Sequence, residues 1–88
     1  MKIEDNKAVF KVKFTRLDDI NTFVNIVNKY NIDIDATQGR WNLNAKSVLA
    51  LYSLNLADEI QIVAYTDDAD IIIRLEKDLK RYYIWNNQ

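Results

Sequence analysis

The sequence predicts an α+β fold, an open-faced sandwich in which a four-stranded antiparallel sheet is covered on one face by three helices. Three observations lead to this prediction. Several short segments alternate apolar and polar residues, which is typical of half-buried strands. Three other segments space their apolar residues three and four positions apart, which is typical of amphipathic helices. The segments follow one another in the order β-α-β-β-α-β-α. Strands that alternate apolar and polar residues favour an antiparallel sheet with one solvent-exposed face.

The first half of the chain predicts a strand, a helix and a hairpin. Phe10, Val12 and the other alternating residues of the stretch 8–14 predict a strand. The segment Thr15-Arg16-Leu17-Asp18 fits a capping pattern, and the apolar spacing that follows predicts a helix from about Asp18 to Tyr30. Alternation over 32–36, a turn at Gln38-Gly39 and the segment 40–43 then predict a hairpin.

The second half predicts a short helix, a strand and a closing helix. Asn44 or Ser47 can cap the short helix, which should end near Asn55. The alternating stretch 59–65 predicts the last strand. Asp67 or Asp68 then opens a helix that extends through Tyr82. The predicted core comprises Phe10, Val12, Phe14, Ile20, Phe23, Val27, Ile34, Val48, Leu51, Ile60, Ile62, Ile72, Leu75 and Leu79.

The composition describes one domain over residues 1–88 and excludes several classes of function. The chain is 49% hydrophobic and 28% charged, and its net charge of -1 gives no general attraction to nucleic acid. It contains neither cysteine nor histidine, which excludes disulfides, thiol chemistry and catalysis by a nucleophile and a histidine. We therefore expect a protein that is not an enzyme and has no cofactor.

Charge placement bears on location and on metal binding. Charged residues interrupt the first ten positions, and no run of about 18 apolar residues occurs, so we expect a cytoplasmic protein without a membrane segment. The acidic cluster at 67–70 lacks the glycine and glutamate of a calcium loop, so we read it as helix capping and predict no metal site. Asp33 and Asp35 share one strand face, where we expect a solvated edge rather than a pocket.

The segment from Asn44 to Leu54 resembles the second helix of HPr, the histidine-containing phosphocarrier of the bacterial sugar phosphotransferase system. That family typically reads Lys-Ser, a branched or Met pair, a small residue, and then Leu, Met, Ser, Leu. The residues here are Lys46-Ser47, Val48-Leu49, Ala50 and Leu51-Tyr52-Ser53-Leu54. The match continues in register over nearly the whole chain. The resemblance implies an HPr-like βαββαβα sandwich.

The resemblance also implies where this chain departs from the family. Counted back from Ser47 at the family's spacing, the phosphoryl-accepting histidine falls on Arg16, and the arginine that follows it by two falls on Asp18. Arginine has no accessible lone pair with which to attack. Asp18 and Asp19 would add negative charge at a helix start that should hold a phosphoryl group, and their ordinary role is capping. The chain is thus identified as a divergent HPr-like member that is not a histidine phosphocarrier.

The same resemblance points to a binding surface on the second helix. Ser47 matches the family's regulatory serine, whose phosphorylation by a dedicated kinase makes the carrier a partner of a catabolite-control repressor. Lys46 would add a cation beside a phosphate there, and the alternative role of Ser47 is to cap the helix. Leu49 and Tyr52 match an exposed docking patch, although they could instead cover the core. We expect Lys46, Ser47, Leu49 and Tyr52 to bind a protein partner.

Two other functions stay open at this point. Ile26, Ile84 and Trp85 lie off the main apolar stripes and could join two copies into a structural homo-oligomer with no phosphate chemistry. The last helix carries a basic flank beside aromatic residues, which could stack on single-stranded RNA. Acidic neighbours dilute that flank, so nucleic-acid binding is the weaker alternative, and we expect no membrane role.

Overall fold

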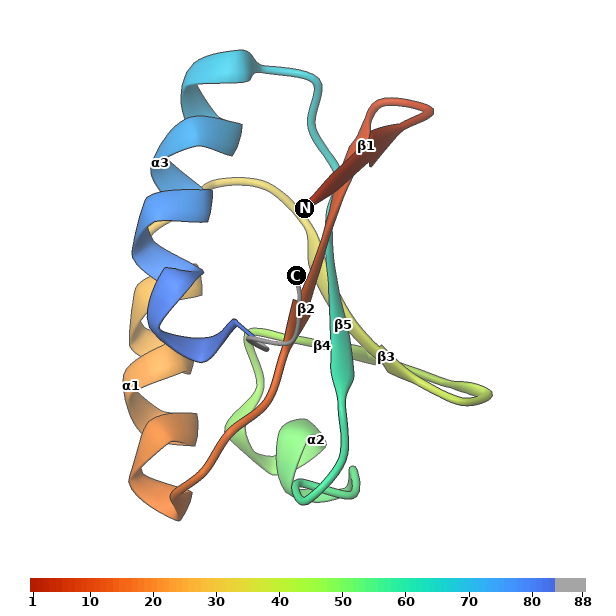
Figure 1. Ribbon diagram of the computed structural model, residues 1–88, viewed down its shortest axis with the longest axis vertical. Helices are drawn as coiled ribbons and strands as arrows, with labels where there is room; N and C mark the ends of the chain where they lie inside the picture. Colours follow the sequence, from red (N-terminus) through yellow and green to blue (C-terminus); the bar gives the residue numbers. More distant parts are fainter. Residues whose placement is uncertain (84–88) are drawn as a thin grey trace.

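The computed structural model describes residues 1–83 of the chain (Figure 1). The elements follow the predicted order, with one additional strand at the start. In chain order they are β1 (Lys2–Glu4), β2 (Lys7–Val12), α1 (Leu17–Val27), β3 (Ile34–Gln38), β4 (Trp41–Asn44), α2 (Val48–Tyr52), β5 (Ile60–Ala64), α3 (Ala69–Leu79) and the 3-10 turn η1 (Lys80–Tyr82).

The strands form one antiparallel sheet in the order β1-β2-β5-β3-β4. The α+β prediction is confirmed, but the sheet has five strands rather than the predicted four. The fifth strand, β1, pairs with β2 through a turn at Asp5 (φ 48°) and Asn6 (φ 63°). Asp and Asn tolerate this left-handed backbone better than most residues, and two such residues suit the turn of a tight hairpin.

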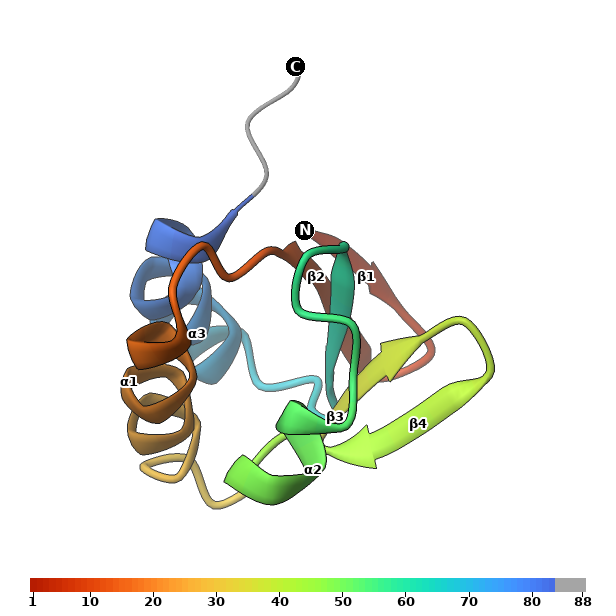
Figure 2. The ribbon, with the colours of Figure 1, turned by 90° about the horizontal axis from the view of Figure 1, so that it is seen from below.

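The helices cover one face of this sheet, and the core lies between the two layers (Figures 1 and 2). α1 and α3 lie side by side against the sheet, and α2 lies at one end of it. Every predicted core residue is buried except Val48, which is half-buried and packs against the rim of the core. Val48 is less covered than predicted because the five-residue α2 places only Leu51 fully inside.

Element boundaries differ from the predicted ones where tertiary contacts replace regular pairing. β2 ends at Val12, and Lys13 N then donates to Tyr82 O at 2.9 Å. Phe14 has left the strand but stays buried, with its ring against Phe23 and Tyr82. α1 ends at Val27 instead of Tyr30. Among the helices of residues 1–83, none has the length and apolar character needed to cross a membrane.

Candidate protein-docking site

The start of α1 and the whole of α2 lie at the same end of the molecule. Figure 1 shows both at the bottom, and Figure 2 shows the segment after α2 facing the start of α1. Three exposed apolar side chains belong to this end, namely Leu17 on α1 and Leu49 and Tyr52 on α2. We call the surface formed by Leu17, Leu49, Tyr52 and the half-buried Leu56 the α1–α2 face.

The first turn of α1 is occupied by its own acidic residues. Asp19 Oδ2 accepts hydrogen bonds from Thr15 N at 3.2 Å, from Arg16 N at 3.1 Å and from Thr15 Oγ1 at 3.3 Å. Asp18 lies 3.5 Å from the Arg16 guanidinium, and both side chains are exposed. The capping role expected of Asp19 is confirmed. Because Asp18 and Asp19 already place negative charge in this turn, this helix start is a poor place for an anion.

The sequence-based interpretation of the α1 start was wrong in one detail. The capping pattern beginning at Thr15 had suggested that Thr15 itself caps the helix. Instead Arg16 is the N-cap residue, with extended backbone angles, and Asp19 reaches back to the amides before it. The register therefore differs by one residue from the predicted one, which moves Leu17 to the first helical position.

Leu17 adds an apolar group to the site that the sequence analysis did not identify. Its side chain is 66% exposed. Together with Phe14 and Leu56 it borders a shallow hollow of about 220 Å³ between the start of α1 and the segment after α2. The sequence feature that could have indicated this exposure is a leucine directly after the N-cap, where no preceding helical turn covers the side chain.

Ser47 caps α2. Its Oγ accepts a hydrogen bond from Ala50 N at 3.2 Å, and its backbone is extended, as an N-cap requires. Of the two cap candidates, Asn44 instead uses Oδ1 to accept from Lys46 N at 2.9 Å, in the turn before the helix. The capping role of Ser47 is thus confirmed, while its phosphorylation stays a prediction.

α2 turns one side inward and leaves the other bare. Leu51 is fully buried, and Leu54 just after the helix is buried as well. Leu49 is 81% exposed and Tyr52 is 43% exposed. The expectation that these two side chains face solvent is confirmed, because α2 turns Leu51 into the core and Val48 against its rim, which leaves Leu49 and Tyr52 on the other side. The alternative, that they cover the core, is wrong.

Lys46 does not stand free beside Ser47. Its Nζ donates to Tyr30 O at 2.6 Å, and its own carbonyl accepts from Asn28 Nδ2 at 3.3 Å. Asn28 Nδ2 also donates to Val24 O at 2.9 Å. These bonds join the end of α1 to the start of α2 and fix the position of the short helix. The ammonium expected to assist a phosphate is therefore already engaged with a backbone carbonyl.

Residues proposed for the other two functions are placed differently from expectation. Ile26 is buried, so it adds nothing to an exposed patch. Ile84 and Trp85 lie outside the described residues. Tyr82 is also buried, with its ring against Phe14 and Phe23, so it offers no face for a base to stack on.

Asp33 and Asp35 line a hollow of about 440 Å³ with Asn44, Lys46 and Tyr65, which corrects the expectation of a solvated edge without a pocket. Tyr65 N donates to Asp33 O at 3.0 Å just beyond β5, which brings Tyr65 next to Asp33 at this hollow. Tyr65 OH donates to Asp35 Oδ2 at 3.0 Å, and this bond raises the pKa of the tyrosine.

Asp68 Oδ1 accepts a hydrogen bond from Asp70 N at 2.9 Å, which confirms the capping role of Asp68 at the start of α3.

Comparison with known proteins identifies the fold. A crystal structure of a phosphocarrier protein HPr from Bacillus anthracis str. Ames aligns with a TM-score of 0.67 and 20% sequence identity, over 89% of this chain and 99% of that chain. No protein-family model matches the chain, and no curated protein matches it. The fold is therefore HPr-like, as the resemblance implied, and at this identity the likeness concerns the fold alone.

Proposed function

We propose that this chain is a non-catalytic, HPr-like interaction or regulatory module that binds a protein partner through the α1–α2 face. The observation that supports the proposal best is the exposure of Leu49, which leaves a large aliphatic side chain bare on a helix that contacts the core through Leu51 and the half-buried Val48. Exposed apolar groups gathered at one end of a small domain are typical of a protein-binding surface.

The proposal excludes histidine phosphoryl transfer. The chain has no histidine, and the position that the HPr resemblance assigns to the phosphoryl acceptor carries Arg16. A guanidinium stays protonated and cannot attack phosphorus. Asp18 and Asp19 add negative charge in the same turn, and Asp19 already holds the nearby backbone amides. A phosphoryl group would find no nucleophilic acceptor there and would meet two carboxylates in the same turn.

The electrostatics of the face favour a partner with an apolar contact surface and a mixed charged rim. Leu17, Leu49 and Tyr52 supply the apolar contact area. Arg16 and Asp18 lie beside Leu17 as an exposed ion pair, so this edge carries both signs of charge. Rim charges of this kind contribute more to partner choice and association rate than to affinity. We propose that the partner is a cytoplasmic protein.

Ser47 is the point at which we propose that a modification acts. Its Oγ is the acceptor that starts α2, so a phosphate there would remain next to the helix amides while adding charge beside Leu49. Ser47→Asp keeps a capping acceptor, whereas Ser47→Ala removes it and should cost about 0.5–2 kcal/mol of stability. If Ser47 modulates binding, Ser47→Asp alters partner affinity at unchanged thermal stability. Equal affinity for wild type and Ser47→Asp would remove Ser47 from the proposal.

The test of the binding face uses two exposed aliphatic residues on different helices. Leu49→Lys changes the α1–α2 face, and Ile73→Lys makes the same change on α3, where Ile73 is 62% exposed. Each variant is immobilised and used to capture partners from the cells that express the protein, with quantification by mass spectrometry. We expect Leu49→Lys to lose a protein that wild type and Ile73→Lys both retain.

Two other outcomes would contradict the proposal. Loss of the captured protein with Ile73→Lys but not with Leu49→Lys would place binding on α3. Self-association that Leu49→Lys abolishes, without any captured partner, would favour the structural homo-oligomer built on the same face. Thermal denaturation of both variants shows that they fold, because a surface substitution changes stability by only about 0.5 kcal/mol.

A further inference from the structure

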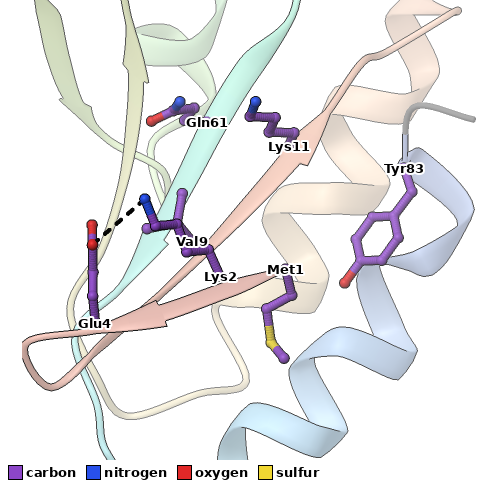
Figure 3. A pocket seen from close by; sticks show the side chains of 7 residues that line it. All are labelled: Met1, Lys2, Glu4, Val9, Lys11, Gln61 and Tyr83. Carbon is purple, nitrogen blue, oxygen red and sulfur yellow. Dashed lines mark ion pairs between the residues drawn. The ribbon is translucent and has the colours of Figure 1, made fainter. Parts of the chain in front are cut away.

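The outer edge of β1 is open in the described part of the chain. β1 is the first strand of the sheet order, and within residues 1–83 no strand pairs with its other side. Lys2 and Glu4 project from the same face of β1, with Lys2 Nζ 3.6 Å from Glu4 Oε2 (Figure 3). Ile3 points to the opposite face and is 59% exposed. An open strand edge is a template for pairing with another strand.

The turn determines which backbone groups of β1 are free. Asp5 and Asn6 form a two-residue turn, so Glu4 and Lys7 are the pair that closes the hairpin through hydrogen bonds. Antiparallel pairs alternate between hydrogen-bonded and non-hydrogen-bonded kinds, so the next pair, Ile3 and Ala8, is not hydrogen-bonded. The N–H and C=O of Ile3 therefore point away from β2, towards the open edge.

We propose that a second copy of this chain pairs with this edge, antiparallel, with Ile3 opposite Ile3 of the second copy. In this two-fold register the two Ile3 residues exchange both backbone hydrogen bonds. Lys2 then lies opposite Glu4 of the second copy, and Glu4 opposite Lys2 of the second copy. The sheets of the two copies join into one continuous sheet.

Charge complementarity is the reason that the occupant is a second copy. The strand Lys2-Ile3-Glu4 carries one charge of each sign on one face, so it neutralises itself when it is paired antiparallel about its own centre. Opposite charges directly across two strands stabilise the pairing, and like charges destabilise it. A three-residue strand buries little area, so we expect a weak dimer that forms at micromolar to millimolar concentration.

Apolar side chains beside β1 would be covered in the same contact. Figure 3 shows Met1 on the side of β1 away from Lys2 and Glu4, in the direction of Tyr83. These residues border a hollow of about 510 Å³ at this edge. Met1 is half exposed, and the second copy's Ile3 would approach it on the helix side of the sheet. Figure 1 shows β1 and α2 at opposite ends, so the dimer leaves the α1–α2 face free.

The test exchanges the two charges separately. Lys2→Glu gives a strand with two negative charges and Glu4→Lys one with two positive charges, so each variant places like charges opposite each other. By sedimentation equilibrium we expect each variant alone to dimerise about tenfold more weakly than wild type, or worse. An equimolar mixture should associate at least as well as wild type, because Lys2 then faces Glu4 and the introduced charges face each other.

A matched control and contrary outcomes make the test decisive. Glu59, just before β5, forms a similar exposed pair with Lys11 at 3.9 Å and does not border the hollow beside β1, so Glu59→Lys should leave association unchanged. Recovery in the mixture shows that both edge variants are folded, and circular dichroism confirms it. Wild type that stays monomeric at millimolar concentration would overturn the proposal, as would a dimer that ignores the charge changes. Because Leu49→Lys leaves this edge intact, it does not affect this dimer.

Discussion

Single side chains from distant parts of the chain hold the helices of this fold together. Tyr30 lies just beyond α1, and its OH donates to Asp78 Oδ2 on α3 at 2.5 Å. Burial, and then the bond to Asp78, raise the pKa of Tyr30 from 10.0 to about 12. Lys46 makes a comparable link, from the start of α2 to the Tyr30 carbonyl. Tyr30 therefore connects all three helices, through its ring hydroxyl on one side and its backbone on the other.

The Tyr30 link predicts how stability depends on pH. A phenol whose pKa is higher in the folded chain than in the unfolded chain stabilises the fold below pH 10, and this contribution disappears as pH rises from about 10 to 12. Urea denaturation across this range should show a smaller loss of stability for Tyr30→Phe than for wild type. Burial also raises the pKa values of Tyr82 and Tyr83, so both proteins should still lose some stability as these two phenols ionise. Tyr52→Phe, on the exposed side of α2, is the control, and a Tyr30→Phe curve identical to wild type would refute the link.

At the scale of elements, the five-residue helix α2 has one side that packs into the core and another that faces solvent. Leu51 fills the core, and Leu49, two positions earlier, faces solvent. The Ser47 cap and the Lys46 and Asn28 bonds hold this short helix in place. Isolated helices of this length do not form in water. The exposed side of α2 is therefore presented by the fold, and changes there need not disturb the core.

Stability measurements should distinguish the two sides of α2. Leu51→Ala removes a fully buried side chain and should cost about 2–5 kcal/mol. Leu49→Lys changes a side chain that is mostly in water and should cost about 0.5 kcal/mol or less. Chemical denaturation of both variants gives these values directly. Comparable costs for the two substitutions would mean that the faces of α2 are wrongly assigned.

The sequence predicted the strands and helices whose apolar residues recur at a regular spacing, and it missed the strand that forms only by pairing with a neighbour. Alternation located β2 to β5, and helical spacing located all three helices with nearly all of their buried residues. β1 was missed because Lys2-Ile3-Glu4 is too short to show a period, and its pairing depends on the turn at Asp5-Asn6. The Phe14 stretch was extended too far because its pattern continues after the strand has ended.

The candidate site was predictable in its residues but not in their contacts. The HPr resemblance identified Ser47, Leu49 and Tyr52, and the structure places Leu49 and Tyr52 in solvent as expected. The resemblance could not show that Lys46 reaches the Tyr30 carbonyl, because that hydrogen bond joins residues 16 positions apart in the sequence. Leu17 was missed because its exposure follows from the helix beginning at Arg16 and from the packing of the segment after α2.

At the scale of the whole molecule, this chain has the fold of HPr without histidine. The fold aligns with an HPr phosphocarrier at a TM-score of 0.67, and yet the chain shares only 20% of the residues and contains no imidazole. A fold can persist through such divergence because its core needs only apolar residues of suitable size and spacing. Function depends on particular side chains, so a shared fold does not transfer it. We therefore propose docking, and not phosphoryl relay, for this molecule.

The most direct test of that claim is a phosphoryl-transfer reaction followed by intact-mass measurement. The chain is incubated with phosphoenolpyruvate and the general enzyme of the sugar phosphotransferase system, with a histidine-containing HPr in the same tube as the positive control. Our account predicts that HPr gains a phosphoryl group while the mass of this chain stays unchanged, because Arg16 cannot accept one and Asp18 and Asp19 repel it. A phosphoryl group on this chain that is stable to alkali and labile to acid would contradict the account.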